Sequence, residues 1–320
     1  MRKIMYGALG LVVIGVIGVI LSINTSGAEA FTFSSVDVHE SKDVSAKGIN
    51  NIVIDSSSVD VNIQPANVDK IEADFSGQVG KKSKDLYKLD MDKDGDTVKI
   101  TMDKKDKFQF MMFNFTKVSL NVKVPQQLYN SIEIEAASAD ITLDEVEAKE
   151  VVIETQSGDI EVSDASAEDT LALQASSGDI TVNGTRSNTL DIQSSSGDIE
   201  MKNNEAKTAD VETSSGEIHS DDLVSDDIKM NTSSGDIVVT AEEITGNVLL
   251  ESSSGDIDVS YTKPATSMKV DYKSSSGDGT ADLDVMNYSE KSEHRIAGES
   301  GDGKFKLTAR TSSGDFTIKD

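Results

Sequence analysis

The chain has 320 residues, contains neither cysteine nor tryptophan, and is only 5% aromatic. Without cysteine it has no disulfides, no thiolate nucleophile and no zinc or iron–sulfur site built on cysteine. Acidic residues outnumber basic ones by 57 to 30, and the resulting net charge of -27 disfavours nucleic acid as a partner because it repels phosphate backbones.

The N-terminus carries a membrane-targeting pattern. Residues 1–3 are a short basic start, and residues 4–23 contain no charge. A helix of that length spans a hydrocarbon core of roughly 30 Å. We therefore expect a single transmembrane anchor at residues 4–23, with a cytoplasmic N-terminus and the rest of the chain extracellular at the cell membrane. The alternative is a signal peptide cleaved near Ala30, which would leave a secreted protein.

A polar linker and an irregular β region follow the apolar run. Residues 24–48 are expected to be the linker, and residues 49–135 the N-terminal β region. Within that region, Ile52 to Val61 has a strand–bend–strand pattern, so the first repeat is expected there. Lys88 to Met102 predicts a hairpin that turns at Asp94-Gly95.

Four phenylalanines lie close together in the same region, at Phe108, Phe110, Phe113 and Phe115. The open end of a repeat fold needs a cover. We therefore predict that this segment caps the first repeat or joins its core. The alternative is a patch that contacts the membrane or a partner.

Residues 136–320 are dominated by a Ser-Gly-Asp-apolar repeat. From Ala139 to Gly255 the central residue recurs every 19 or 20 residues, and the steps after Gly255 are less even. The glycines predicted to form the repeated structural turn are Gly158, Gly178, Gly197, Gly216, Gly235, Gly255, Gly277, Gly301 and Gly314. Such a period indicates one short supersecondary unit stacked many times.

Each unit is predicted to contain two strands joined by the Ser-Gly-Asp bend. Apolar residues alternate with polar ones at Leu190 and Ile192, and again at Ile199 and Met201, which is the period of a strand. The alternation slips by one across Gly197, so the chain must bend there for both sets to face one interior. Glycine permits such a bend, and aspartate can bond nearby backbone amides.

These features predict an all-β fold, a parallel β-solenoid or β-helix of about 19–20 residues per coil. Equivalent strands of adjacent coils would pair in parallel. Near-identical residues at near-constant spacing favour this stack, because each side chain then lies on its own copy. The alternative is an antiparallel meander or sandwich in which Ser-Gly-Asp closes hairpins.

Stacked coils would place acidic side chains in one row, formed by Asp159, Asp179, Asp198, Glu217, Asp236 and Asp256. Like charges at strand spacing repel, and calcium ions between them would relieve the repulsion. The favoured interpretation is instead that the turn backbone binds each aspartate. Asp90 to Gly95 also resembles a calcium loop, but Thr101 occupies the position of the required glutamate. No metal ion or cofactor is therefore expected.

No catalytic constellation stands out in the sequence. Its three histidines are scattered, and it has no nucleophile elbow, phosphate-binding loop or HExxH motif. We therefore predict no catalytic or cofactor-binding residues and no small-molecule substrate. The alternative is a glycan-acting β-helix enzyme of the cell wall, a lyase or hydrolase, because some parallel solenoids cleave polysaccharides.

The order of these features resembles a known family. A basic start, one apolar run, the V-x-V-P strand ending at Pro125 with Tyr129 close behind it, and Ser-Gly-Asp-Ile repeats are similar to the putative-adhesin family of Gram-positive bacteria. This family is a domain of unknown function and includes LiaG-like envelope-stress proteins. The resemblance implies a membrane-anchored, non-enzymatic binding or scaffold module that faces the cell wall. Its expected partners are a wall polymer or a membrane protein.

Overall fold

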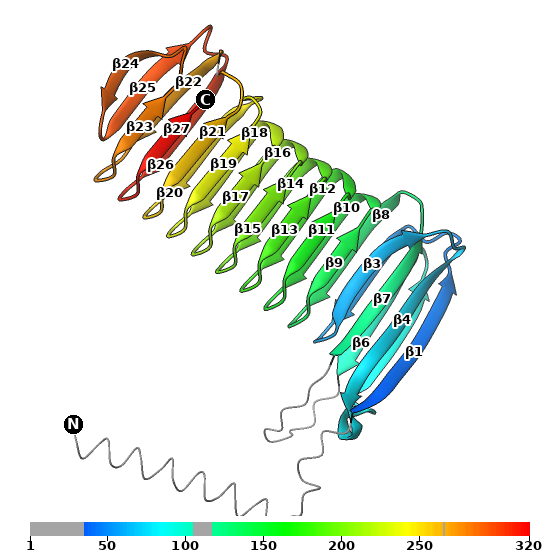
Figure 1. Ribbon diagram of the computed structural model, residues 1–320. Coiled ribbons are helices and arrows are strands. Elements are labelled where there is room, and N and C mark those ends of the chain that lie inside the picture. Colours follow the sequence, from blue (N-terminus) through cyan, green and yellow to red (C-terminus); the bar gives the residue numbers. More distant parts are fainter. Residues whose placement is uncertain (1–34, 105–116, 265) are drawn as a thin grey trace, which may run out of the picture.

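The computed structural model describes residues 35–104, 117–264 and 266–320. Two long β-sheets pack face to face and form an elongated rod (Figure 1). The predicted all-β parallel solenoid is confirmed. No helix of the described residues is long and apolar enough to cross a membrane. The predicted anchor, the cleavage site near Ala30 and the four phenylalanines at 108–115 lie outside the described residues.

Sheet A holds the short strands that follow the Ser-Gly-Asp bends. In spatial order its 13 strands in the described chain are β1 (Ser35–Ser45), β4 (Lys70–Gly80), β7 (Lys117–Pro125), β3 (Asp60–Ala66), β9 (Ile141–Asp144), β11 (Ile160–Ser163), β13 (Ile180–Asn183), β15 (Ile199–Lys202), β17 (Ile218–Asp221), β19 (Ile237–Ala241), β21 (Ile257–Tyr261), β27 (Phe316–Lys319) and β23 (Gly279–Asp282).

Sheet B holds the longer strands that lead into the bends. Its 14 strands within the described ranges are β24 (Asn287–Ser292), β25 (Arg295–Ser300), β22 (Met268–Lys273), β26 (Phe305–Thr311), β20 (Asn247–Ser252), β18 (Val224–Thr232), β16 (Glu205–Thr213), β14 (Arg186–Ser194), β12 (Ser166–Ala175), β10 (Glu147–Thr155), β8 (Tyr129–Ala136), β2 (Asn51–Ser56), β6 (Thr97–Lys104) and β5 (Tyr87–Asp94). A 3-10 turn, Lys81–Ser83, precedes β5.

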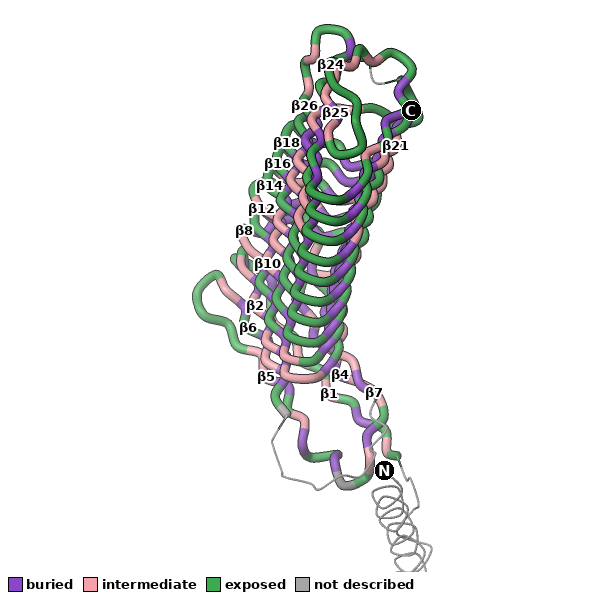
Figure 2. Tube along the Cα trace, turned by 90° about the vertical axis from the view of Figure 1, so that its left-hand side faces the viewer, coloured by how far each residue is buried: buried purple, intermediate pink, exposed green. Residues whose placement is uncertain are grey.

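Each coil repeats the register of the one before it. In β14, Ile192 lies opposite Leu173 of β12 and Val211 of β16. The alternate residues point inward, and the buried positions form continuous rows along the inside of the rod (Figure 2). Burying an isoleucine contributes about 1.5–3 kcal/mol. The rod is therefore stabilised by many similar contributions rather than by one compact core.

A second corner, which the sequence reasoning missed, follows the short strands β9, β11, β13, β15 and β17. There the backbone enters the left-handed region, with φ of +51° at Asp164 and +53° at Asn203. Gly184 occupies the same place with φ of +67°. Asp, Asn and Gly tolerate this conformation better than other residues. Each of the three lies six residues after its corner glycine, a regularity that would have predicted this corner.

At both ends of the rod the order of coils in space differs from their order in the chain. The last coil of the sequence, β26–β27, lies between β20–β21 and β22–β23. At the other end, β6 and β7 lie outside β2 and β3. We expected coils stacked in chain order through residues 136–320. At the C-terminal end this expectation is corrected, because β26–β27 is inserted between the two coils that precede it in the sequence.

Antiparallel strands cover the terminal coils. At the N-terminal end β5 pairs with β6, while β4 pairs with β7 and β1 with β4. The pairing of β5 with β6 confirms the predicted hairpin, and Gly95 has φ of +63° at its turn. At the C-terminal end β24 and β25 extend sheet B beyond β22. These antiparallel strands end both sheets at the N-terminal end of the rod and sheet B at its C-terminal end. There sheet A ends with β23, which pairs in parallel with β27.

Candidate functional site

The Ser-Gly-Asp corners form a column along one edge of the rod. A Cβ atom placed on Gly197 would lie 1.8 Å from the carbonyl oxygen of Gly178. Glycine is therefore needed because successive backbones approach closely, not because of its φ angle. The described members, in spatial order after Ala139, are Gly158, Gly178, Gly197, Gly216, Gly235, Gly255, Gly314 and Gly277.

Gly301 lies outside this column. It has φ of +61° in the turn between β25 and β26, and a Cβ there would lie 2.1 Å from the oxygen of Thr266. The triplet Ser300-Gly301-Asp302 therefore has the same letters as a corner but a different role. Val59, in contrast, occupies a corner position without being glycine, and its N–H donates to Ser56 Oγ at 3.2 Å.

A buried hydroxyl group three residues before most of the corner glycines connects neighbouring coils, although Ala175 occupies this position before Gly178 and Ser274 bonds differently before Gly277. Thr213 Oγ1 accepts the N–H of Gly216 and donates to the carbonyl oxygen of Gly197, both at 3.2 Å. The equivalent side chains that make the same two bonds are Thr155, Ser194, Thr232, Ser252 and Thr311. Each hydroxyl satisfies two backbone groups that water cannot reach.

Replacing Thr213 by valine should lower the free energy of unfolding by about 2–4 kcal/mol. Valine keeps the shape of threonine, but it deprives one buried N–H and one buried carbonyl of their partner. Urea unfolding of Thr213→Val against Thr213→Ser tests this. The serine variant should stay within about 1 kcal/mol of the native protein, because Ser194 and Ser252 make the same bonds. Equal losses in the two variants would contradict the prediction.

The corner aspartates form what we term the aspartate ladder. The N–H of Asp198 donates to Oδ1 of Asp179 in the preceding coil at 2.8 Å. The same bond joins Asp159 to Asp140, Asp179 to Asp159, Glu217 to Asp198, Asp256 to Asp236, Asp315 to Asp256 and Asp278 to Asp315. An aspartate at this position therefore connects two coils, which accounts for the constancy of the residue.

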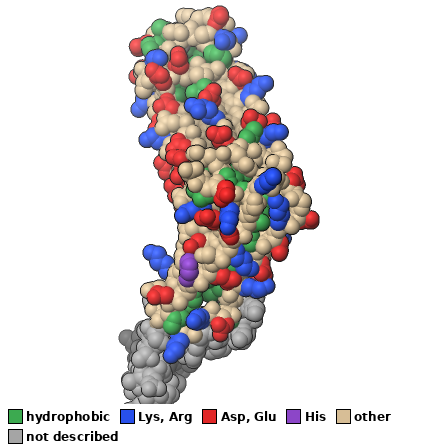
Figure 3. Space-filling model, turned by 90° about the vertical axis from the view of Figure 1, so that its right-hand side faces the viewer, with side chains coloured by type: hydrophobic (Ala, Val, Ile, Leu, Met, Phe, Trp, Pro, Cys, Tyr) green, Lys and Arg blue, Asp and Glu red, His purple; other side chains and the backbone are tan. Residues whose placement is uncertain are grey.

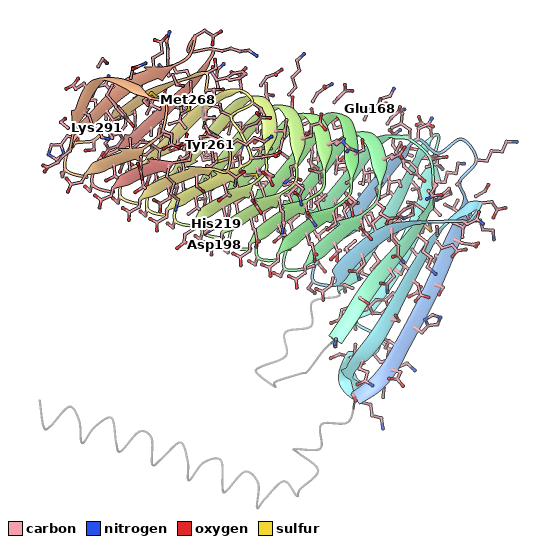
Figure 4. The ribbon with its side chains drawn as sticks, turned by 45° about the horizontal axis from the view of Figure 1, so that its top comes forward. Glu168, Asp198, His219, Tyr261, Met268 and Lys291 are labelled. Atoms are coloured by element: carbon pink, nitrogen blue, oxygen red, sulfur yellow. The ribbon has the colours of Figure 1, made fainter. Side chains whose placement is uncertain are left out.

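Glu217 breaks the aspartate ladder. Its carboxylate lies 3.0 Å from Nε2 of His219, and among the described hydrogen bonds none joins the N–H of Asp236 to Glu217. Asp198 and His219 are labelled on the corner edge of the rod in Figure 4. The extra methylene of glutamate moves the carboxylate away from the next amide.

Glu217→Asp should therefore stabilise the protein by about 1 kcal/mol, the usual net value of a hydrogen bond. Chemical denaturation measures the change, and slower hydrogen exchange at the Asp236 amide locates it. The control is Glu200→Asp, which shortens an exposed glutamate of β15 that does not belong to the aspartate ladder. An unprotected Asp236 amide in Glu217→Asp would contradict the prediction.

No group of three or more His, Asp or Glu side chains within the described ranges is arranged to hold a metal ion. The aspartates proposed as a calcium row use one oxygen each to bind the next coil. Asp90, in the calcium-like motif, instead bonds to Lys88 and pairs with Lys42 at 3.2 Å. These two ammonium groups lower the pKa of the Asp90 carboxyl.

Calcium should consequently leave the thermal stability of the protein unchanged. We expect the same melting temperature in millimolar calcium and in excess chelator at constant ionic strength, because general screening acts equally in both. Differential scanning calorimetry measures it. A magnesium sample separates a calcium-specific effect from a general divalent one. A rise in calcium alone would show that ions bind within the row.

Tyr129, the tyrosine that follows the V-x-V-P strand, has a structural role. Its hydroxyl donates to the carbonyl oxygen of Pro125 at 3.1 Å, across the connection from β7 to β8. The side chain is buried, and this burial raises the pKa of Tyr129 to about 12. The residue therefore fixes where the irregular region joins the regular coils and is structural rather than catalytic.

The outer face of sheet B carries a shallow groove of about 690 Å³ that crosses β14, β16, β18, β20 and β26. Short side chains such as Thr189 and Thr208 are among its lining residues. Two smaller hollows, of about 440 and 350 Å³, lie on the same sheet. Because the strands run across the rod, a groove over five of them follows the rod axis.

Charges of both signs line this groove, which we term the sheet B groove. Its acids are Asp191, Asp210 and Asp227, and its bases are Lys229, Lys306 and Arg310. Many of them pair between coils. Lys229 Nζ lies 3.0 Å from both carboxylate oxygens of Asp210, and Arg310 lies 3.1 Å from Glu251. Sequence reasoning missed the groove, although threonine recurs at the repeat spacing at 170, 189 and 208.

The described surface has no broad hydrophobic patch. Its exposed large hydrophobic side chains are Leu128, Val224 and Val285, which belong to different parts of the rod. In the view of Figure 3, acidic and basic side chains are interspersed over the surface. The groove has no aromatic side chain among its lining residues. The groove therefore offers hydroxyls, one amide and charges, together with the apolar side chains Ala209, Ile228, Val248 and Leu249.

Comparison with protein families shows which family has this arrangement of coils. Two overlapping matches to the description Toastrack DUF4097 cover residues 49–221 and 167–319. The chain belongs to the Toastrack DUF4097 family. The overlap follows from the repeat, because one set of coils satisfies both matches. The family is one of unknown function. A comparison with the curated proteins gives no match.

Two solved structures with TM-scores of 0.50 and 0.51 share the fold of this chain at low sequence identity. A protein described as a putative adhesin from Parabacteroides merdae is 13% identical with a TM-score of 0.51, over 88% of this chain and 96% of that one. One of the same description from Parabacteroides distasonis is 14% identical with a TM-score of 0.50, over 88% and 97%. A P. distasonis protein described as a putative lipid binding protein is 16% identical with a TM-score of 0.49, over 88% and 97%.

Proposed function

We propose that this Toastrack protein is a non-enzymatic binding module of the cell envelope, held at the outer side of the membrane by residues 4–23. The sheet B groove carries the proposal, because it is long, open and aligned with the rod axis. An enzyme concentrates its reacting groups in one pocket. Here the lining charges are instead distributed over the strands, and Lys229 pairs with Asp210 inside the groove while Arg310 pairs with Glu251 beside it.

The groove suits a linear hydrophilic polymer. Its hydroxyl and amide groups can exchange hydrogen bonds with a hydroxyl-rich chain, and Lys306 and Arg310 offer positive charge at one end of it. Both side chains are 54% exposed, and each also faces a carboxylate, Lys306 at 3.8 Å from Asp271 and Arg310 at 3.1 Å from Glu251. The net charge of -27 repels polyanions in general, so a cell-wall polymer that carries phosphate groups fits this groove only where its phosphates contact these two cations. A role in envelope stress in a Gram-positive cell is consistent with such a ligand.

Co-sedimentation of the full chain, in detergent micelles, with purified cell-wall sacculi tests the proposal. We expect binding that falls when the anionic polymers are stripped from the wall. Lys306→Glu/Arg310→Glu should bind at least about tenfold more weakly, because two contacts become repulsive. The matched control is Lys202→Glu, an equal type of change on the outer face of sheet A. Equal binding by all three proteins would overturn the proposal.

The same samples distinguish binding from catalysis. The supernatants are assayed for newly formed reducing ends after prolonged incubation. We expect none above the level of sacculi alone. Release that depends on the protein would replace the binding role with glycan cleavage.

A further inference from the structure

One strand edge of the molecule is long and straight. The described parts of the two sheets end at β1, β5, β23 and β24. Of these, β1 is the longest, and its eleven residues pair with β4 in an unbroken antiparallel register. It lies at the outer end of sheet A, away from the regular coils (Figure 1). The free side of such a strand offers backbone N–H and C=O groups to another strand.

The other three edges are shorter and are obstructed. On β5, the N–H of Leu89 donates to Glu40 at 3.5 Å. On β23, the carbonyl oxygen of Ala281 accepts the ammonium group of Lys291 at 2.7 Å and the hydroxyl of Tyr288 at 3.4 Å. Lys291 is labelled at that end of the rod in Figure 4. The remaining edge, β24, has six residues and an interrupted register.

The charges of β1 discriminate between registers in which it could pair with a second copy of itself. Two antiparallel copies must match residues of the same parity, because alternate residues point their backbone groups to the free edge. A register centred on Glu40 places Glu40 opposite Glu40 and Asp37 opposite Asp43. A register centred on Lys42 places two lysines together. Both are disfavoured by like charges directly across the pair.

The register centred on Ser41 places opposite charges, rather than like charges, across the pair. It brings Glu40 of each copy opposite Lys42 of the other, and His39 opposite Asp43. It also brings Val38 opposite Val44, and Ser41 opposite its own copy. Each pair of two different residues occurs twice because of the two-fold symmetry. Opposite charges and matched apolar residues across an antiparallel pair are stabilising.

We propose that β1 is a dimerisation edge, which pairs antiparallel with β1 of a second copy around a two-fold axis at Ser41. The pairing is isologous, so it closes after two copies and does not lead to fibres. Sheet A becomes continuous across the joint. The two rods then extend in opposite directions, and Ser35 of both copies lies near the centre of the assembly.

The absence of cysteine makes the register directly testable. The full chain carrying Ser41→Cys, in detergent micelles with a mild oxidant, should give a disulfide-linked dimer, because the two residues face each other. The matched control is Ser45→Cys, which is exposed on the same face of the same strand. Its two copies would be eight residues apart along the pair, roughly 27 Å, beyond the reach of a disulfide. It should remain monomeric.

A mixture of Asp37→Cys and Ser45→Cys proteins adds a second readout, because these positions lie opposite each other in the proposed register. We expect disulfide-linked dimers in the mixture and none when either protein is oxidised alone. Equal cross-linking of Ser41→Cys and Ser45→Cys would indicate random collision and overturn the proposal. An uncross-linked Ser41→Cys protein, at concentrations where Ser45→Cys is also monomeric, would overturn it as well.

Charge exchange tests the pairing without cysteine. Lys42→Glu places two carboxylates opposite each other in both halves of the pair, because Glu40 faces position 42, and should raise the dimer dissociation constant about tenfold in sedimentation equilibrium. Glu40→Lys/Lys42→Glu restores opposite charges and should return the constant to the native range. Circular dichroism verifies that both variants fold, since Lys42 also pairs with Asp90 at 3.2 Å. Failure of the double variant to recover would overturn the register.

Discussion

Gly197→Ala should lower the free energy of unfolding by at least about 3 kcal/mol, the upper range for forcing extra atoms into a packed interior. The added methyl group would lie 1.8 Å from the oxygen of Gly178 and 2.4 Å from its carbonyl carbon. Both are backbone atoms held by bonds between coils, so no side chain can move aside. The coils at this corner must separate, which stretches the aspartate ladder and the hydroxyl bonds beside it.

Hydrogen exchange followed by mass spectrometry measures where the damage lies. Because each coil contacts only its neighbours, protection should fall in β12 to β17 and persist at the two ends of the rod. Ser196→Ala is the control, since that side chain is exposed and adjacent in the sequence. It should remain within about 0.5 kcal/mol of the native protein. A stable Gly197→Ala protein would show that the column has more space than its glycines indicate.

Phe316→Ala should cost about 3–5 kcal/mol and detach the C-terminal end of the rod. Phe316 is almost fully buried and replaces the isoleucine of other coils between Ile257 and Gly279. Its ring stacks on Tyr272, with centroids 4.7 Å apart. Alanine at this position would leave a cavity between the inserted last coil and the coil that it supports.

The expected signature is a two-step unfolding curve in denaturant. The first step should correspond to loss of protection in β22 to β27, while β10 to β19 stay protected as in the native protein. Phe305→Ala is the matched control, because Phe305 belongs to β26 but is only partly buried. A single cooperative transition for Phe316→Ala would mean that the end of the rod does not unfold on its own.

The regular part of the fold follows from local sequence, and for that reason it was predictable. Ile192 and Ile199 have the alternation of strands, and the 19- or 20-residue period favours parallel stacking. The structure of the two ends of the rod could not be predicted from local sequence in the same way. The strand at Phe316 has the same apolar alternation as the strand at Ile257, so the sequence does not show that the last coil inserts beside β21. Only the uneven steps after Gly255 indicated a change.

The candidate sites show the same limit. The corner glycines were identified by their spacing, but Gly301 matched the triplet without joining the column. Gly303 follows Asp302 where other units have an apolar residue, yet Gly279 follows Asp278 and that unit does join. The triplet alone therefore does not decide the role. The sheet B groove depends on side-chain lengths across five coils, which becomes visible only when their register is known.

The insertion of the last coil between two earlier ones has a consequence for the order in which the protein folds. A chain emerges from the ribosome with its N-terminus first, and domains generally begin to fold in that order. Coils from β8 to β21 can add one after another, each on a completed template. The strands β22 to β25 cannot take their final place until residues 305–319 have emerged and entered between them and β21. Completion of this end therefore waits for the finished polypeptide, and a chain that stops early lacks the piece that joins its terminal cap to the rest.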